Sequence, residues 1–379
     1  MLPVALMPLA VRTSLPRAAV RLRICVRRSQ LFEDSFQQLP KVEAPRIFGR
    51  LLVTFIGEES LDAGGVAREW YVLMLRAMFN PSYSLFQPAA DKRSTFQPSR
   101  LSALDRQHLQ LFRFAGRFAG KALHDGYLLD AYLTRSFYKH MLGVRPSYHD
   151  LESVDPKYYS SLCWMLENDV TGVLDHLSLT AEQNDLGVQR EVELKAGGRE
   201  VNVGDENKRR YVELMAQHLL TDVIRPQIDA FLEGFHELTA PQHVALLCDS
   251  ELELLMCGLA DVDIADLRAH TQYEGYKESD EVVQWFWRVV EQLEDGQKAQ
   301  LVQLVTSTSR VPIGGFAALR GMHDATQPFK MHRASGQNRL PAAHTCFNQL
   351  ELPGYSSMRK LEEMLLLALR EGGEGFAFR

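Results

Sequence analysis

A polar stretch near residue 271 constrains the fold of this chain more than any other feature of its sequence. The segment 271–276 contains one glycine and separates an acidic helical pattern from an aromatic one. The chain has 379 residues, enough for two or three domains that each bury their own core. We therefore predict two unequal parts that meet at this stretch.

Helical periodicity dominates both parts. Apolar residues at helical spacing predict helices over 66–79, 108–122, 128–142, 281–293 and 357–370. The short, β-branched segment 50–57 predicts a strand. From about 154 to 214 the sequence is more polar and includes a strand candidate, which predicts a small insertion of mixed structure. The predicted fold class is therefore α+β.

The first 32 residues carry six arginines and no acidic side chain. Such a segment is typical of an organelle transit peptide, or it forms the basic end of an amphipathic helix over 19–39. Serine and threonine are sparse here, which favours the helix over targeting. Five cysteines without a CxxC pair indicate a reducing compartment. We therefore expect a cytoplasmic location, with the nucleus as a second one.

Charge is distributed unevenly along the chain. The whole chain carries −6, the first 32 residues carry six positive charges, and residues 277–379 balance 12 basic against 12 acidic side chains, so residues 33–276 carry −12. This acidic body disfavours a nucleic acid partner and would steer a basic protein partner toward it. No apolar run is long enough to cross a bilayer, so we expect no membrane partner.

Cys346 differs from the other cysteines because its neighbours are polar. It lies in the segment 340–348, which prolines bracket, so we predict a short, partly exposed loop. A thiol in such a loop can act as a nucleophile, and His344 could raise its thiolate fraction at neutral pH. The residues alone leave two alternatives open. A single cysteine is more often a small core residue, and His344 could equally well only cap the loop.

The remaining chemical signals are weak. Cys163, Cys248 and Cys257 lie in or beside apolar helical patterns, which predicts structural roles for them. The glycine pairs at 64–65 and 314–315 lack the lysine of a phosphate loop, and the sequence has no HExxH motif. We therefore expect no cofactor and no metal site.

Ordered motifs along this sequence resemble the HECT class of ubiquitin ligases from about residue 19 to the C-terminus. The motifs that carry the resemblance are Gly57-Glu-Glu, Arg68-Glu69-Trp70, Phe114-Ala-Gly-Arg117, Leu166-Glu-Asn168, Arg225-Pro-Gln227, Thr306-Ser-Thr-Ser-Arg310 and the segment Leu340–Asn348 with Leu352-Pro353. The last of these is the most specific. The likeness is closest to the catalytic end of the very large plant and fungal members.

The resemblance implies a bilobal α+β fold. After an N-terminal extension over 1–18, a mostly helical N-lobe over 19–272 would contain a small subdomain, at about 154–214, that recruits a ubiquitin-conjugating enzyme. A hinge would join it to a smaller α/β C-lobe over 277–379. The resemblance assigns Tyr273, Glu274, Gly275 and Tyr276 to the hinge, and Leu162, Leu166 and Tyr211 to the groove for the conjugating enzyme.

The same resemblance implies a sequence of reactions at Cys346. This thiol would accept ubiquitin as a glycyl thioester, with His344 and Thr345 beside it, and would pass ubiquitin to a lysine of a protein substrate. Phe376 stands four places from the end, where the family has a functional phenylalanine, and Glu374 or the terminal carboxylate would supply an acidic group. Ala342 and the final Phe-Arg depart from the family pattern, so the identity of that acid stays open.

Two alternatives remain at this stage. A cysteine hydrolase would need a histidine and an acidic or amide side chain brought to Cys346 from elsewhere, and the sequence identifies no such pair. A ubiquitin-pathway binding module with a catalytically dead C-lobe would keep the binding features and lose only transfer. Formation of a ubiquitin adduct on Cys346 separates both alternatives from a ligase.

Overall fold

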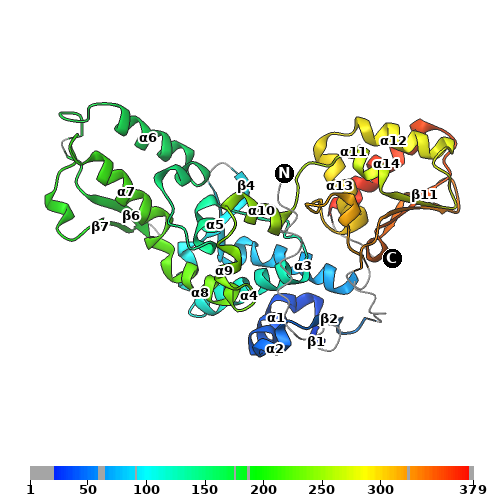
Figure 1. The fold of residues 1–379 in the computed structure, drawn as a ribbon, viewed down its shortest axis with the longest axis horizontal. Helices are drawn as coiled ribbons and strands as arrows, with labels where there is room; N and C mark the ends of the chain where they lie inside the picture. The colour runs from blue at the N-terminus through cyan, green and yellow to red at the C-terminus, as the bar shows by residue number, and fades with distance from the viewer. Residues whose placement is uncertain are drawn as a thin grey trace. The chain divides into compact units, whose positions relative to one another are not determined.

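The computed structural model describes residues 21–58, 65–89, 92–174, 176–185, 188–321 and 325–374. They pack as two compact units (Figure 1). The first unit combines residues up to 75, the segment 122–130 and the chain from 254 onward, and the second combines 76–121 with 131–253. Over the described ranges, no helix is both long and apolar enough to cross a membrane. The mixture of helices and strands confirms the predicted α+β class.

The first unit begins with a pair of parallel strands. β1 (Arg21–Val26) lies beside β2 (Arg50–Phe55), and the helix α1 (Leu31–Gln38) follows β1. The prediction of a helix from residue 19 is therefore wrong, whereas the strand predicted over 50–57 is confirmed. The reason lies in β1 itself, where even-numbered residues are buried and odd-numbered ones are exposed. This period of two belongs to a strand rather than a helix.

The start of α3 (Gly65–Met78) is firmly anchored in this part of the unit, which also contains the short helix α2 (Ala44–Ile47). The fully buried Trp70 donates from its indole Nε1 to Ser35 Oγ at 2.9 Å. One residue earlier, Glu69 forms an ion pair with Arg28 at 2.6 Å. The helix predicted over 66–79 is confirmed. The two contacts fix the position of its first turns.

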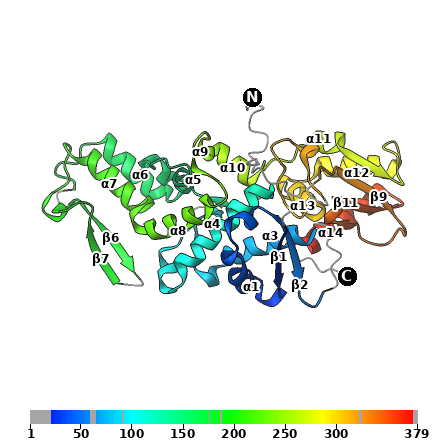
Figure 2. The ribbon, with the colours of Figure 1, turned by 60° about the horizontal axis from the view of Figure 1, so that its bottom comes forward.

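The C-terminal part of the first unit is a four-stranded sheet covered by helices (Figure 2). The strands, in spatial order, are β10 (Ala342–His344), β11 (Gln349–Pro353), β9 (Phe329–Ala334) and β8 (Thr271–Glu274). The helices are α11 (Ile264–Ala269), α12 (Glu281–Gln292), α13 (Asp295–Thr306) and α14 (Met358–Glu374). Phe286, Leu350 and Leu361 belong to the hydrophobic cluster that joins helices and sheet. The helices predicted over 281–293 and 357–370 are confirmed.

The second unit is mainly helical. Its strands include β3 (Phe86–Ala89), β4 (Lys92–Pro98) and β5 (Tyr132–Leu133). Its helices include α4 (His108–Asp125), α5 (Arg135–Met141), α8 (Arg225–His236), α9 (Pro241–Val244) and α10 (Asp249–Cys257), and the C-terminal ends of α4 and α10 belong to the first unit. The helix predicted over 128–142 is partly wrong. Residues 132–133 pair in parallel with β4, so a strand ladder replaces helical bonds there, and the helix starts only at Arg135.

A separate core lies within the second unit, where the sequence predicts a small insertion. It is built from α6 (Pro156–Glu167), α7 (Lys208–Leu220) and the antiparallel hairpin β6 (Thr180–Asp185) with β7 (Val188–Glu193), seen together in Figure 1. One hydrophobic cluster, from Leu151 to Leu220, joins α6, α7 and β6, and β7 pairs with β6. The segment therefore has a core of its own.

Helices α4 and α8 cross in close contact through two glycines. A Cβ atom on Gly116 would lie 1.9 Å from the carbonyl oxygen of Phe231, and one on Gly234 would lie 1.9 Å from that of Arg113. Backbone atoms cannot move aside as the end of a flexible side chain can. The crossing therefore requires glycine on both helices.

We predict that Gly116→Ala lowers the free energy of unfolding by about 3 kcal/mol, because the added methyl group forces two packed helices apart. The matched control is Gly296→Ala in α13, where nothing lies within 4 Å of the added atom. There the better helix propensity of alanine should stabilise the protein by up to ~1 kcal/mol. Urea unfolding followed by circular dichroism measures both changes, and equal effects of the two substitutions would contradict the crossing described here.

Candidate active site

Cys346 lies in a tight connection between two strands of the C-terminal sheet. β10 and β11 are antiparallel, with Ala342 opposite Glu351 and His344 opposite Gln349. Between them, residues 345–347 form a short 3-10 turn, η11 (Thr345–Phe347). The structure describes the backbone of Cys346 but not its side chain. The loop expected from the sequence is thus a turn with a defined backbone, which we call the cysteine turn (residues 345–348).

Asn348 closes the cysteine turn and is completely buried. Its φ of 49° lies in the left-handed region, which asparagine tolerates better than most residues. Its amide Nδ2 donates to the carbonyl oxygens of Arg320 at 3.0 Å and Gln327 at 2.8 Å. Its own carbonyl accepts from the backbone N–H of Lys330 at 2.8 Å. Both the main chain and the side chain of Asn348 therefore attach the turn to the sheet and to the loop before β9.

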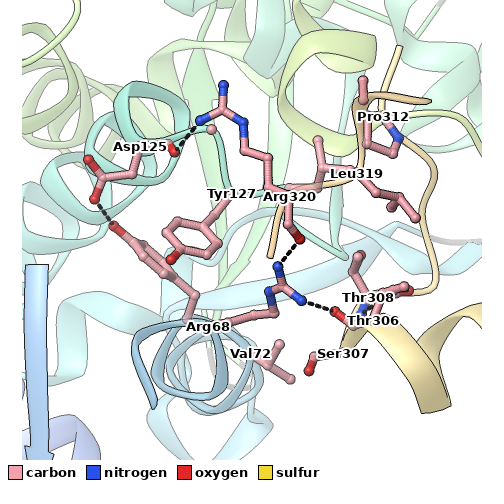
Figure 3. A pocket seen from close by; sticks show the side chains of 14 residues that line it. Arg68, Val72, Asp125, Tyr127, Thr306, Ser307, Thr308, Pro312, Leu319 and Arg320 are labelled. Carbon is pink, nitrogen blue, oxygen red and sulfur yellow. Dashed lines mark hydrogen bonds between the residues drawn. The ribbon is translucent and has the colours of Figure 1, made fainter. Parts of the chain in front are cut away.

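Arg68, from the first turn of α3, also binds the cysteine turn. Its Nη1 lies 2.8 Å from the carbonyl oxygen of Thr345, 3.0 Å from Asn348 Oδ1 and 3.1 Å from the carbonyl oxygen of Thr306. Its Nη2 donates to the carbonyl oxygen of Arg320, as Figure 3 shows. Arg68, Asn348 and the Arg320 carbonyl thus form a closed ring of hydrogen bonds. The ring fixes the orientation of the Asn348 amide, because only its oxygen can accept from Arg68.

A small pocket of about 90 Å³ lies beside this ring (Figure 3). On one wall, the hydroxyl of Tyr71 donates to Asp125 Oδ2 at 3.0 Å, and Arg320 Nη1 donates to the Asp125 carbonyl at 3.2 Å. Gly126, with a φ of 77°, leaves room for the Arg320 guanidinium, since a Cβ there would lie 2.8 Å from Arg320 Cζ. The volume suits a few ordered water molecules and is far below that of a typical cofactor site.

His344 has a defined partner in the structure. Its Nε2 lies 3.1 Å from Glu351 Oε1, diagonally across the β10–β11 pair, and Arg339 binds the other oxygen of the same carboxylate. Burial acts to raise the pKa of Glu351, but the hydrogen bonds from His344 and Arg339 outweigh it, so the pKa lies below its ordinary value. The side chain of His344 is half exposed. The pairing orients the imidazole and keeps a negative charge beside it.

The residues predicted to bind a conjugating enzyme lie in the core of the small subdomain. Leu162 is 2% exposed and Tyr211 is 4% exposed, while Leu166 is partly buried against the same cluster. Burial raises the pKa of the Tyr211 hydroxyl, with a further contribution from Tyr158. Among the described residues of this subdomain, the large apolar side chains that are exposed are Trp164 and Val173, at 47% and 62%. A role in binding stays a prediction for Leu162, Leu166 and Tyr211.

The four predicted hinge residues are attached to the C-terminal sheet. Tyr273 and Glu274 belong to β8, and the Tyr273 hydroxyl accepts from Trp287 Nε1 at 3.0 Å. Gly275 has a φ of 76°, and the buried Tyr276 donates from its hydroxyl to the carbonyl oxygen of Leu352 at 3.0 Å. The core cluster also includes Leu267, which precedes the predicted boundary. Bending at these residues, and the lobe boundaries, stay predictions.

Two further predicted site residues lie at the C-terminal end of the chain. Glu374 is the last residue of α14, and its side chain is outside the described part of the structure. Phe376 lies outside the described residues altogether. Thr345, by contrast, lies in the cysteine turn, and Arg68 Nη1 binds its carbonyl oxygen at 2.8 Å. A catalytic role of Thr345 stays a prediction.

The cysteine turn thus lies at the edge of a small C-terminal sheet. It follows, in the chain, a larger part made of helices and strands that contains a separate small core. The family model described as HECT-domain (ubiquitin-transferase) matches residues 72–379. The chain therefore belongs to the HECT-domain family, as the sequence motifs predict.

Its relatives include very large proteins. The chain is 49% identical over 364 residues to the E3 ubiquitin-protein ligase UPL1 of Arabidopsis thaliana, a match that covers 94% of this chain and 10% of the relative. It is 44% identical over 352 residues to the E3 ubiquitin-protein ligase HUWE1 of Mus musculus, covering 93% of this chain and 8% of the relative. The chain thus spans about a tenth of the length of these curated relatives.

Sequence reasoning missed the residues that hold the cysteine turn. Arg68 was visible as part of a motif, but no signal in the sequence indicated that its side chain would reach residues 345 and 348. Glu351 is the diagonal partner of His344 only because of the strand register, which depends on the turn length. The left-handed backbone of Asn348 could have been suspected, because asparagine tolerates this conformation and stands at the end of the predicted loop.

We predict that Asn348→Ala lowers the free energy of unfolding by about 3 kcal/mol. A strained left-handed alanine costs about 1–2 kcal/mol, and the buried groups left without their partner add about 1–3 kcal/mol. Asn348→Gly removes the same hydrogen bonds but permits the backbone conformation, so its loss should be smaller. Guanidinium unfolding followed by tryptophan fluorescence compares the two, and a larger loss for glycine than for alanine would argue against the strain described here.

Proposed function

We propose that this chain acts as a HECT-type ubiquitin ligase that carries ubiquitin as a thioester on Cys346. The observation that carries the proposal is membership of a ubiquitin-transferase family over residues 72–379, with Cys346 held in a turn between β10 and β11. The relatives named above are E3 ubiquitin-protein ligases, although the chain covers about a tenth of their length. The partners we propose are ubiquitin, a ubiquitin-conjugating enzyme and protein substrates.

The first step is an exchange of one thioester for another. The Cys346 thiolate attacks the carbonyl carbon of ubiquitin's C-terminal glycine, the new sulfur–carbon bond forms, and the thiolate of the conjugating enzyme leaves. The two thioesters are close in energy, so holding the reacting groups in place contributes more than activating them. A turn fixed by the hydrogen bonds of Asn348 and by the β10–β11 pairing suits this requirement.

The second step forms an isopeptide bond. A substrate lysine amine attacks the Cys346 thioester, the Cys346 thiolate leaves, and the amine gives up a proton. Because an unperturbed lysine has a pKa of ~10.4, a nearby acceptor for that proton assists. Glu374, the terminal carboxylate and the His344–Glu351 pair are the groups we propose for this role or for orienting the lysine.

The small subdomain is the part that we propose binds the conjugating enzyme. Its exposed apolar side chains, Trp164 and Val173, are suited to contact a partner surface, since aromatic residues contribute strongly at interfaces. Leu162, Leu166 and Tyr211 would then support that surface from beneath it. The net charge of −12 over residues 33–276 would attract a basic surface of the partner.

Loading of Cys346 is the decisive prediction. Incubation with activating enzyme, a panel of conjugating enzymes and ubiquitin should give an adduct that thiol reductants remove. Cys346→Ala should abolish the adduct, and Cys346→Ser should convert it to an ester that resists reductant. Cys248→Ala is the matched control, because Cys248 is an exposed free thiol and should leave the adduct unchanged.

Three outcomes of this experiment would reject the proposal. Free release of ubiquitin without an adduct would indicate a hydrolase. An adduct that survives Cys346→Ala would place the chemistry elsewhere. A wild-type protein that binds the conjugating enzyme but never accepts ubiquitin would indicate the binding module.

We also predict that Phe376→Ala slows isopeptide formation at least tenfold and changes loading of Cys346 by less than about threefold, because the family's phenylalanine at this place acts after loading. The control is Phe378→Ala, a substitution of the same residue type two places further on. Single-turnover loading and chase with a lysine acceptor separate the two steps. Equal slowing of both steps by Phe376→Ala would remove the late role assigned to it.

A further inference from the structure

Arg68 joins three segments that are far apart in the sequence. Its guanidinium donates to the end of α13 at Thr306, to the loop before β9 at Arg320, and to the cysteine turn at residues 345 and 348. Each of these acceptors is at least 238 residues away along the chain. No part of the chemistry proposed above uses the side chain of Arg68 as a reacting group.

The geometry requires an arginine rather than a generic positive charge. Four oxygens surround one guanidinium, and two of them, Arg320 O and Asn348 Oδ1, are themselves linked through the Asn348 amide. A planar group with five N–H donors in a fixed arrangement can serve such a set. A lysine ammonium has three donors on a flexible chain and could satisfy only some of the oxygens.

The side chain is presented to these oxygens by a rigid segment. The next two residues of α3 are held by the ion pair of Glu69 with Arg28 and by the bond from Trp70 to Ser35. On the opposite side, the Arg320 side chain donates to the carbonyl oxygen of Asp125. Both ends of the contact are therefore fixed by independent bonds within the first unit.

We propose that Arg68 is a positioning residue that holds the cysteine turn against α3 during transfer of ubiquitin from Cys346 to lysine. This inference rests on the proposed function. The proposed docking site of the conjugating enzyme lies in the second unit, whereas every contact of Arg68 described here lies within the first. Arg68 therefore serves the step that does not need the conjugating enzyme.

The expected slowing of transfer without Arg68 follows from the position of Thr345. Its carbonyl oxygen belongs to the peptide group that precedes Cys346, and Arg68 Nη1 binds it at 2.8 Å. Loss of that bond would let the peptide plane rotate and would displace the backbone from which the thioester extends. Displacements of about 1 Å can slow a positioned reaction by about a hundredfold.

The test is a single-turnover assay that separates the two steps. Cys346 is first loaded with ubiquitin, the conjugating enzyme is then quenched, and the adduct is chased with a lysine acceptor. Arg68→Gln should lower the chase rate at least tenfold while changing loading by less than about threefold, and Arg68→Lys should give an intermediate rate. Arg76→Gln is the matched control, an exposed arginine of the same helix, and should leave both rates unchanged.

The outcomes distinguish this inference from the proposed function. If the wild-type protein forms no adduct, the proposed function fails whatever Arg68 does. If the wild-type protein loads and discharges ubiquitin and Arg68→Gln does so at the same rates, the positioning role is overturned while the function stands. A chase rate for Arg68→Lys equal to that of wild type would show that charge alone suffices, which overturns the role of the guanidinium geometry.

A second measurement tests the contact between Arg68 and Asn348 without an activity assay. Arg68→Gln, Asn348→Ala and the double variant are compared by the midpoint of guanidinium unfolding. Because the two side chains share one hydrogen-bonded ring, the shift of the double variant should be clearly smaller than the sum of the single shifts. Additive shifts would show that the ring does not form in solution and would overturn the proposal even if the chase rates changed.

Discussion

The ring of hydrogen bonds formed by Arg68, Asn348 and the carbonyl of Arg320 fixes the geometry of the candidate active site. The cysteine turn is short, and Asn348 at its end adopts a backbone conformation that few residues tolerate. Such a turn keeps its shape only when surrounding groups hold it. These groups come from the start of α3, from the loop before β9 and from the sheet itself, so the site depends on distant parts of the first unit.

This dependence agrees with the chemistry proposed for Cys346. A hydrolase must activate water against a stable bond, and it therefore needs a strong base beside its nucleophile. Exchange between thioesters starts from an activated carbonyl and ends with another, so the demand is for orientation. The structure supplies orientation in the form of a buried amide and strand pairing. The His344–Glu351 pair adds a polar group beside the turn.

Much of the fold could be predicted from hydrophobic periodicity, because long amphipathic helices such as α3, α4, α12 and α14 repeat their pattern over many residues. The strand β2 was also predictable, but two other short strands, β1 and β5, were not. β1 has only six residues in an arginine-rich segment, and β5 exists because it pairs with β4, a contact that no local pattern reveals. The identity of Cys346 as the candidate nucleophile was readable from its motif. Its supports were not, since a side chain at residue 68 reaches the turn only in the folded chain.

The strength of the Arg68 contact matters as much as its geometry. A hydrogen bond to a charged group contributes about 1.5–3 kcal/mol, but bonds that share one guanidinium are not additive and are offset by the loss of its hydration. A net contribution on the order of 3 kcal/mol corresponds to a preference of about a hundredfold for the bound arrangement. For the carrier proposed above, a preference of this size would hold the turn during transfer and still let the contact open for loading. A much weaker contact would leave the turn unpositioned for transfer, and a much stronger one would slow its release for the next round of loading.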